Sequence, residues 1–370
     1  MRPTSRSLAS SKWRWRSVWG WGLIISAYAG LLVTMEIYKS ASHNLDSHRN
    51  KLHLSYLPPM AHVPAVTVAN ANEAVIKSKK AVLILFGVPK HFRLVLRSYM
   101  KNIVQRNPQM KFEVYIHMYS DLHLQPFSSD RNGETNAQLD SPDDIRAILF
   151  DELGGNVSKL LTTSSQSIFE ELELSWLQQN DTSFFDVDYP FQTLQNMFRQ
   201  GNSLREAFFS FQKHNNSWNG NNDWVCIFAR SDTFLMDAVD IPSGIGNNDV
   251  VVPRWTSAFG YNDRFAVAGS DSAKVYATKI VGYKEAILTR RSKPEAELES
   301  LRNSETLLKK WLVENKVNVT ERENLHEWGL LRLRADGQIA NNDLGEFDLK
   351  EKNISHVEHL HNVNASLVEH

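Results

Sequence analysis

Hydrophobic residues follow two different patterns just after residue 80. Residues 81–88 (AVLILFGV) form an unbroken apolar run, which is typical of a strand buried on both faces. Residues 92–107 place apolar side chains at helical spacing, and residues 111–119 (KFEVYIHMY) alternate as a strand does. This succession predicts a strand–helix–strand unit, in which the two strands run parallel in one sheet.

The same patterns predict the elements farther along the chain. We expect helices over residues 143–154, from Pro190 onward, over 270–291 and over 303–315, the last with Ser304 as its N-cap. Apolar runs predict strands over residues 224–229, 249–255 and 329–337. The predicted fold class is α/β, a Rossmann-like mixed sheet flanked by helices, over residues 79–338.

The amino-terminal residues combine a basic segment with an uncharged one. Residues 1–16 contain five Lys or Arg and no acid, and residues 17–35 contain no charge. As a helix, the second segment would span about 28 Å, close to the hydrocarbon thickness of a bilayer. We predict a cytosolic tail (1–16), a transmembrane signal anchor (17–35) and a lumenal remainder. The alternative is a cleaved signal peptide, because Ala27-Tyr28-Ala29 has the small-x-small form.

Polar segments flank the predicted domain on both sides. Residues 36–78 are rich in His, Ser, Asn and Pro and are predicted to form a lumenal stem. Residues 339–370 are polar and are predicted to form a flexible tail. Asn-x-Ser/Thr sequons, the acceptors of N-glycosylation, all fall on the predicted lumenal side, at Asn156, Asn180, Asn215, Asn318, Asn353 and Asn364.

Composition narrows the class of protein. Of the 370 residues, 42% are hydrophobic and 22% are charged, which is enough for a sizeable core and excludes wholesale disorder. The 41 Lys and Arg nearly balance the 42 Asp and Glu, so a nucleic-acid footprint over the whole surface is excluded. A single cysteine, Cys226, excludes an intramolecular disulfide and a cysteine-rich zinc site.

Two predicted strands end in groups that suit a diphosphate. The first ends at Gly87, with Arg93 shortly beyond it, and the strand 224–229 is followed by Arg230 and Asp232. Ligands of α/β proteins bind beyond the carboxyl ends of parallel strands. We therefore expect Arg230 to pair with phosphate oxygens and Asp232 to hold a divalent ion or a ribose hydroxyl. The alternative is a strand-end turn in which Asp232 caps the chain and Arg230 is solvated.

The segment DWVCIFARSDTFLM resembles the strand that carries the DxD motif in GT-A glycosyltransferases, with Arg230 in place of the first acid. FGVPKHF, QNMFRQGNSLREAF, R-x-D, W-x₅-YNDRFAVAG, SETLLKKWL and LRLRADG follow in an order similar to that of a poorly characterised GT-A-like group of type II membrane proteins. The resemblance covers residues 81–338. It implies a GT-A-like catalytic domain and a nucleotide-sugar donor, and the incomplete DxD leaves dependence on Mn²⁺ or Mg²⁺ open.

A literal D-x-D motif occurs elsewhere, at Asp186 and Asp188. It precedes Pro190 and a predicted helix, and no long apolar strand leads into it. We interpret these two residues as acids favoured at a helix start by the helix dipole. They remain the alternative metal site to Asp232.

Residues 253–269 (PRWTSAFGYNDRFAVAG) supply further candidates. Trp255 offers an apolar ring on which a sugar would stack, and Asn262 and Arg264 offer contacts to hydroxyl and phosphate groups. An inverting transferase needs a carboxylate to take the acceptor proton, and Asp263 is the candidate. The alternative is an Asn-Asp turn before a helix, with Arg264 in a salt bridge.

Arg332 and Arg334 alternate with leucines in the last predicted strand, so both are expected on one face. Two cations there would neutralise a leaving nucleoside diphosphate and replace a missing metal ligand. The alternative is a solvated edge strand whose charges discourage aggregation.

These features predict a type II glycosyltransferase of the Golgi or ER membrane, anchored through residues 17–35. It would move a sugar from a nucleotide-sugar donor to a glycan, protein or lipid acceptor, with Mn²⁺, Mg²⁺ or no metal, and without nucleic acid. The alternative is a non-catalytic lumenal protein that binds nucleotide sugar or glycan on a degenerate transferase fold. An anchored sulfotransferase is less favoured, because His91, Phe92 and Arg93 stand where a phosphate-cradling loop needs small and hydroxyl residues.

Overall fold

The computed structural model describes a set of ranges that begins at the first predicted strand. These are residues 80–121, 139–154, 158–178, 191–215, 224–255, 257, 260–289, 303–322, 324, 327–340, 343, 347, 355 and 357–360. All of them belong to the second of two units into which the chain divides, Val75–His370. Within these ranges, no helix is both long enough and apolar enough to cross a membrane. The predicted anchor and stem lie outside the described residues.

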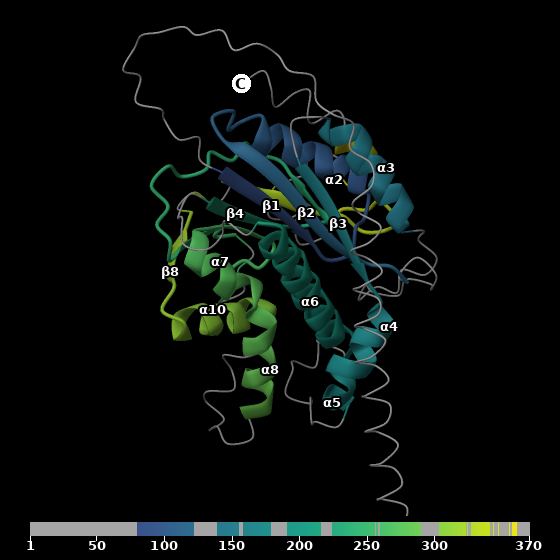
Figure 1. Ribbon diagram of the computed structural model, residues 1–370, viewed down its shortest axis with the longest axis vertical. Helices are drawn as coiled ribbons and strands as arrows, with labels where there is room; N and C mark the ends of the chain where they lie inside the picture. The colour runs from purple at the N-terminus through teal and green to yellow at the C-terminus, as the bar shows by residue number, and fades with distance from the viewer. Residues whose placement is uncertain are drawn as a thin grey trace, which may run out of the picture. The chain divides into compact units, whose positions relative to one another are not determined.

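A mixed sheet of seven strands carries the described chain (Figure 1). Its order is β3-β2-β1-β4-β7-β6-β8. Strands β3, β2, β1 and β4 are mutually parallel, β6 is parallel to β8, and β7 runs antiparallel to both of its neighbours. The bounds are β1 Lys80–Phe86, β2 Lys111–Tyr119, β3 Ser158–Ser164, β4 Trp224–Arg230, β6 Asp249–Val252, β7 Phe265–Ala268 and β8 Asn318–Glu321.

Helices cover both faces of this sheet. One core contains Leu83 and Leu85 of β1 with side chains of α2 (Phe92–Tyr99) and α3 (Pro142–Leu153). The other contains Ile84 of β1 with side chains of α6 (Phe191–His214), α7 (Ser270–Ala277) and α10 (Ser304–Glu314). Successive residues of a strand point to opposite faces, so these two cores explain why the first apolar run is unbroken. The predicted strand–helix–strand unit is confirmed, because β1 and β2 pair in parallel around α2.

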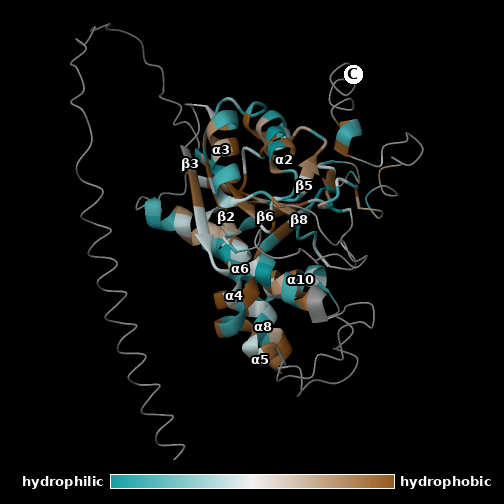
Figure 2. Cartoon of the chain, turned by 90° about the vertical axis from the view of Figure 1, so that its right-hand side faces the viewer, coloured by the Kyte–Doolittle hydropathy of each residue, from teal (hydrophilic) through white to brown (hydrophobic). Residues whose placement is uncertain are grey.

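A third apolar cluster lies among the helices that extend away from the sheet, α4, α5 and α8 in Figures 1 and 2. It joins α6 to α8 (Lys279–Thr289) and to a helical stretch made of α4 (Gln166–Phe169), the π-helical η3 (Glu170–Leu174) and α5 (Ser175–Gln178). A π-helical segment, η1 (Met100–Val104), likewise continues α2. The predicted helix 270–291 is thus two helices, because the chain turns at Thr278 between α7 and α8.

A small antiparallel sheet lies on the α2 side of the main sheet. It pairs β5 (Thr233–Leu235) with β9 (Leu330–Arg332), and Thr233 stands opposite Arg332. The predicted strand 329–337 is therefore shorter than expected and belongs to this second sheet. Its leucines join the same core as α2, which keeps β9 from being a solvated edge strand.

The prediction of a flexible tail over residues 339–370 is wrong for the described part of that segment. Ile339 and Leu360 are buried in the α2 core, and the side chain of Asp343 is fully buried. Backbone hydrogen bonds join Ile339 to Ser355 and Val357 to Gly337. Sequence periodicity missed this packing because the buried residues are isolated apolar positions in a polar segment.

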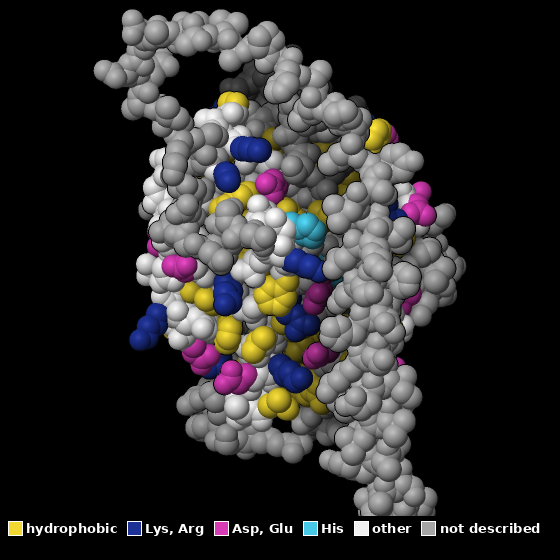
Figure 3. Space-filling model, viewed as in Figure 1, with side chains coloured by type: hydrophobic (Ala, Val, Ile, Leu, Met, Phe, Trp, Pro, Cys, Tyr) yellow, Lys and Arg dark blue, Asp and Glu magenta, His cyan; other side chains and the backbone are white. Residues whose placement is uncertain are grey.

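Charges of both signs mix on the outer surface. On the face shown in Figure 3, Lys and Arg side chains alternate with Asp and Glu side chains and with apolar ones. That mixture matches the near balance of the whole chain. The charges that matter for chemistry are instead the buried ones.

Candidate active site

The strand order reverses between β1 and β4, which makes their carboxyl ends the switch point of the sheet. From β1 the chain leads to β2 on one side, and β4 lies on the other side. Ligands of open α/β sheets bind in the crevice outside such a point. The sequence places Gly87 directly after β1 and Arg230 at the end of β4, and the two strands pair in register there. The candidate site is therefore built from this edge outward.

Gly87 shapes the turn that leaves β1. Its φ angle is 94°, a left-handed conformation that glycine adopts without a steric penalty. Its N–H donates to Ser203 Oγ (2.9 Å), and Ser231 Oγ donates to the Phe86 carbonyl (3.0 Å). The turn is thus fixed on both sides, and the chain is led past the end of β4.

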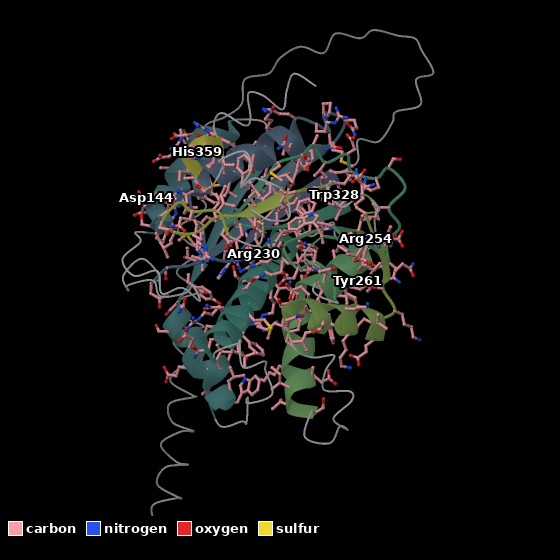
Figure 4. The ribbon with its side chains drawn as sticks, turned by 180° about the vertical axis from the view of Figure 1, so that it is seen from behind. Asp144, Arg230, Arg254, Tyr261, Trp328 and His359 are labelled. Carbon is pink, nitrogen blue, oxygen red and sulfur yellow. The ribbon has the colours of Figure 1, made fainter. Side chains whose placement is uncertain are left out.

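Arg230 and Asp232 bind each other in a two-pronged ion pair. Arg230 Nε donates to Asp232 Oδ1 (2.8 Å) and an Arg230 terminal nitrogen donates to Oδ2 (2.7 Å). Asp232 is only 4% exposed. Burial alone would raise the pKa of Asp232, but the charge and hydrogen bonds of Arg230, with Lys90 and Arg332 nearby, hold that pKa below its usual value. Figure 4 labels Arg230, near the centre of the view.

The antiparallel direction of β7 brings a further group of charges to the same edge. Because β7 opposes β4, its amino-terminal end lies beside the carboxyl end of β4, and the Arg230 N–H donates to the Arg264 carbonyl (3.1 Å). Asp263 and Arg264 precede β7 directly. A parallel strand at this place would have carried these residues to the opposite edge of the sheet.

Arg264 is held by a residue from the carboxyl-terminal segment. Its guanidinium donates to Asp343 Oδ1 (2.8 Å), and Asp343 Oδ2 accepts the N–H of Arg332 (2.7 Å). The pairing of β9 with β5 sets Arg332 beside the R-x-D segment. The predicted salt bridge of Arg264 therefore exists, and its partner Asp343 lies in the segment that the sequence assigned to a tail.

Two further cations line this part of the site. Lys90 follows the Gly87 turn, is 7% exposed, and lies near Asp232. Arg334 is buried as well, and the His91 ring hydrogen-bonds its carbonyl (3.1 Å). The pairing of β9 with β5 brings Arg332 to the R-x-D segment, and Arg334 follows two residues later. That their side chains share one face stays a prediction.

Asp263 belongs to a second cluster, with Ser304, Glu305 and Lys279. The Ser304 hydroxyl lies within hydrogen-bond reach of both carboxyl groups, and its single proton is donated to Glu305 Oε2 (3.0 Å) or to Asp263. The prediction of Ser304 as N-cap is wrong. The Ser304 hydroxyl is therefore not used to cap α10 and can contact the two carboxyl groups. Asn303 caps α10 instead, in a reciprocal capping box with Thr306.

The pKa values of the two carboxyl groups in this cluster are shifted in opposite directions. Burial tends to raise the pKa of Asp263, but Lys279, Arg230 and Arg264 together hold it below its usual value. Burial and the negative charge of Asp263 raise the pKa of Glu305 to about 7. One carboxyl is thus ionised at neutral pH, and its neighbour exchanges a proton there.

Lys279 is a residue that the sequence analysis missed. It is 1% exposed, and its ammonium makes no hydrogen bond within the described part of the chain. It lies over the rings of Tyr276 (4.9 Å to the centroid) and Phe86 (5.5 Å). Burial lowers its pKa to about 8, although the charges of Asp263 and Glu305 oppose that shift. The Tyr276 hydroxyl is buried and lacks a hydrogen-bond partner in the same ranges.

Three side chains that were predicted to contact a ligand make contacts within the protein instead. Arg93 is 42% exposed and pairs with Asp151 (2.9 Å) and Glu152 (2.5 Å) of α3. Trp255 is 1% exposed, its ring packs against Phe347 and Arg264, and it presents no open face to a sugar.

Asn262 also holds the loop rather than a ligand. Its side-chain nitrogen donates to the Trp255 carbonyl (2.8 Å), and its side-chain oxygen accepts the Arg264 N–H (2.9 Å). The alternative for this segment was an Asn-Asp turn before a helix with Arg264 in a salt bridge; the salt bridge is present, but strand β7 and not a helix follows. The role of Asn262 is to place Asp263 and Arg264.

The environment of Asp232 does not fit a divalent cation. Arg230 occupies both carboxylate oxygens, and Lys90 and Arg332 add positive charge next to them. A metal needs several oxygen ligands of net negative charge. Among the described residues, no group of three His, Cys, Asp or Glu side chains is arranged to hold a metal ion. Asp186 and Asp188 lie outside the described residues.

Together these side chains form a charge network with an excess of positive charge. Among the residues that the structure describes, it holds five cations and four carboxyl groups, and buried Arg334 adds a cation two residues from Arg332. A buried cation is costly unless an anion pairs with it, so an anionic ligand would complete this network. Its members are Lys90, Arg230, Arg264, Lys279, Arg332, Asp232, Asp263, Glu305 and Asp343.

Two of the six sequons can be placed. Asn318 lies exposed on β8 and donates to Asp249 Oδ1 (3.1 Å). Asn215 follows α6, and its side-chain nitrogen donates to Glu113 Oε2 (2.9 Å) and to the Tyr115 hydroxyl (3.1 Å). The other four sequons, Asn156, Asn180, Asn353 and Asn364, lie outside the described residues.

Comparison with known proteins adds no relative. No family model matches this chain, and no curated protein is detectably similar to it.

Proposed function

We propose that the chain is a glycosyltransferase with a GT-A-like fold that uses a nucleotide-sugar donor. The observation that carries the proposal is the network of buried charges at the switch point, in which the described residues supply more cations than carboxyl groups. Arginines in such a place suit the oxygens of a diphosphate, and carboxyl groups beside them suit proton transfer to or from a sugar acceptor. The mixed sheet supports the GT-A-like fold that the sequence resemblance implies.

The proposed reaction relies on protein cations rather than on a metal. Arg332, Arg334 and Lys90 would hold the diphosphate and take up the charge that develops on it when the sugar leaves. Arg230 is kept in place for this purpose by Asp232, since an ion pair of that geometry fixes the guanidinium plane. Neither Mn²⁺ nor Mg²⁺ is needed in this scheme.

The proposed location is the Golgi or ER membrane, with a type II topology and a lumenal catalytic domain. The support for it is the basic segment 1–16 followed by the uncharged segment 17–35. The acceptor would be a glycan, a protein or a lipid within the lumen. The proposal includes no nucleic-acid partner.

Measuring the binding and turnover of nucleotide sugars by the full chain tests this function. UDP, GDP and their hexose forms are titrated by calorimetry, and donor hydrolysis is followed by release of the nucleoside diphosphate. We expect binding and slow hydrolysis of one nucleotide series, with or without EDTA. Binding of a nucleotide sugar with neither hydrolysis nor transfer to any acceptor tested would favour the alternative, a non-catalytic lumenal binding protein. The absence of binding to every nucleotide would refute the proposal.

A further inference from the structure

Glu305 is held against the loop that carries Asp263. The Tyr261 N–H donates to the Glu305 carbonyl (3.1 Å). Gly260 comes so close that a Cβ atom there would lie 2.0 Å from the Glu305 carbonyl carbon and 2.1 Å from its oxygen. Only glycine permits that approach. The first turn of α10 is therefore fixed relative to the amino-terminal end of β7.

Glu305 is the least buried of the charged members of this cluster. Lys279 is 1% exposed and Asp263 is 5% exposed, whereas Glu305 is partly exposed. Of the two carboxyl groups, Glu305 is therefore the more accessible to solvent and to a substrate hydroxyl. The Ser304 hydroxyl lies between the two carboxyl groups and can donate its proton to either one, so it couples Asp263 to Glu305.

We propose that Glu305, and not Asp263, is the catalytic base of this site, with Asp263, Ser304 and Lys279 as positioning residues. This inference rests on the proposed glycosyl transfer. Glu305 takes the proton of the acceptor hydroxyl while the acceptor oxygen forms a bond to the anomeric carbon. The bond from that carbon to the diphosphate oxygen breaks, and its electron pair leaves with the diphosphate. This direct displacement inverts the configuration at the anomeric carbon.

The neighbouring charges suit Glu305 to this role. Asp263 disfavours its ionised form, whereas Arg264, Lys279 and the Ser304 hydroxyl favour it. The resulting pKa of about 7 lets the carboxylate accept a proton readily at neutral pH. The lowered pKa of Asp263 makes that residue a weaker base. A general base of this kind contributes about a 10²- to 10⁴-fold rate enhancement.

The first experiment compares Glu305→Gln with a matched variant, Glu314→Gln, in the full chain. Both residues lie on α10, and Glu314 is an exposed acid at its far end, paired with Lys310. Donor hydrolysis, with water as the acceptor, should fall at least about 100-fold in Glu305→Gln and stay unchanged in Glu314→Gln. The affinity for the nucleoside diphosphate, measured by calorimetry, should stay within about twofold in both.

The second experiment measures the midpoint of the pH–rate profile in variants of the residues around Glu305. If these residues were merely structural, their substitutions would not move that midpoint in opposite directions. The wild-type rate should rise with pH through a midpoint near 7, as Glu305 loses its proton. Removing the neighbouring negative charge in Asp263→Asn should lower the midpoint. Removing positive charge in Lys279→Met, or the hydroxyl donor in Ser304→Ala, should raise it. Ser304→Ala keeps the helix cap on Asn303, so it is the variant most certain to fold.

The outcomes separate this inference from the proposed function. If the wild-type chain binds no nucleotide, the proposed function fails. If it binds and hydrolyses donor, but Glu305→Gln keeps more than a third of the rate, Glu305 is not the base and the function stands. A loss of nucleotide affinity in Glu305→Gln that equals its loss of rate would also overturn the inference, because the residue would then act in donor binding. A midpoint unmoved in Ser304→Ala would contradict it as well.

Discussion

Asp232→Asn gives a direct measure of the buried ion pair at the end of β4. The substitution removes the charge of a carboxylate that is 4% exposed and accepts two hydrogen bonds from Arg230. Removing one partner of a buried ion pair costs about 3–5 kcal/mol, because the other charge stays buried. The asparagine oxygen can still accept one hydrogen bond, so we expect a loss near about 3 kcal/mol. For a domain of this size, that lowers the melting temperature by about 6–12 °C.

The assay is thermal and urea unfolding of the full chain at pH 7. The matched variant is Asp240→Asn, which breaks the exposed ion pair with Arg106 and should leave the melting temperature unchanged. A double-mutant cycle with Arg230→Gln should show coupling of about 1–3 kcal/mol, because the pair is lost only once. The sign with pH also follows. Since the folded pKa of Asp232 is lowered, its contribution is present at neutral pH and is lost as the pH falls through that pKa.

Two results would refute this reasoning. A loss below about 1 kcal/mol in Asp232→Asn would mean that the pair behaves like an exposed one. If the losses in free energy of unfolding from the two substitutions simply add, the Arg230 and Asp232 side chains do not stabilise each other.

Three further predictions concern other parts of the chain. Arg332→Met should weaken nucleoside diphosphate binding at least about tenfold by calorimetry, while exposed Arg146→Met has no effect. In protein from a eukaryotic secretory host, mass spectrometry should find a glycan on Asn318, which is exposed on the edge strand β8, but none on Asn215, which is half-buried and whose side-chain nitrogen makes two hydrogen bonds. Burial lowers the pKa of His117 to about 3, so stability should fall as the pH drops from about 6.5. Between pH 7 and pH 5, urea unfolding should show about 2 kcal/mol more loss in wild type than in His117→Gln.

The parts of the fold that sequence reasoning found are those buried on both sides. The runs that became β1 and β4 are apolar throughout, and a two-faced core is the reason for that pattern. Strand β8 was missed because it lies at the sheet edge and its sequence, NVTE, carries no apolar run. Strand β7 was missed because four residues between charged loops do not establish a period.

The site was predictable only as far as strand ends could locate it. Arg230 and Asp232 follow an evident buried strand, so their place at the sheet edge was correct, but their mutual pairing needed three-dimensional geometry. Lys279 looked like an ordinary lysine in a predicted helix, because its burial depends on the break at Thr278. Asp343 stands in a polar segment, where no local pattern distinguishes a buried carboxylate from a solvated one.

The burial of Asp343 has a consequence for how the chain is made. Arg264 and the backbone N–H of Arg332 are satisfied by Asp343, a residue that the ribosome adds after every strand of the main sheet. The sheet can form earlier, because all seven strands precede residue 322. During translation there is therefore a stage at which the strands of the sheet are already made but Arg264 lacks the carboxylate of Asp343. A chain stopped at residue 338 would lack Asp343, so the candidate site needs the segment after residue 338 to neutralise Arg264 and to hold the backbone of Arg332.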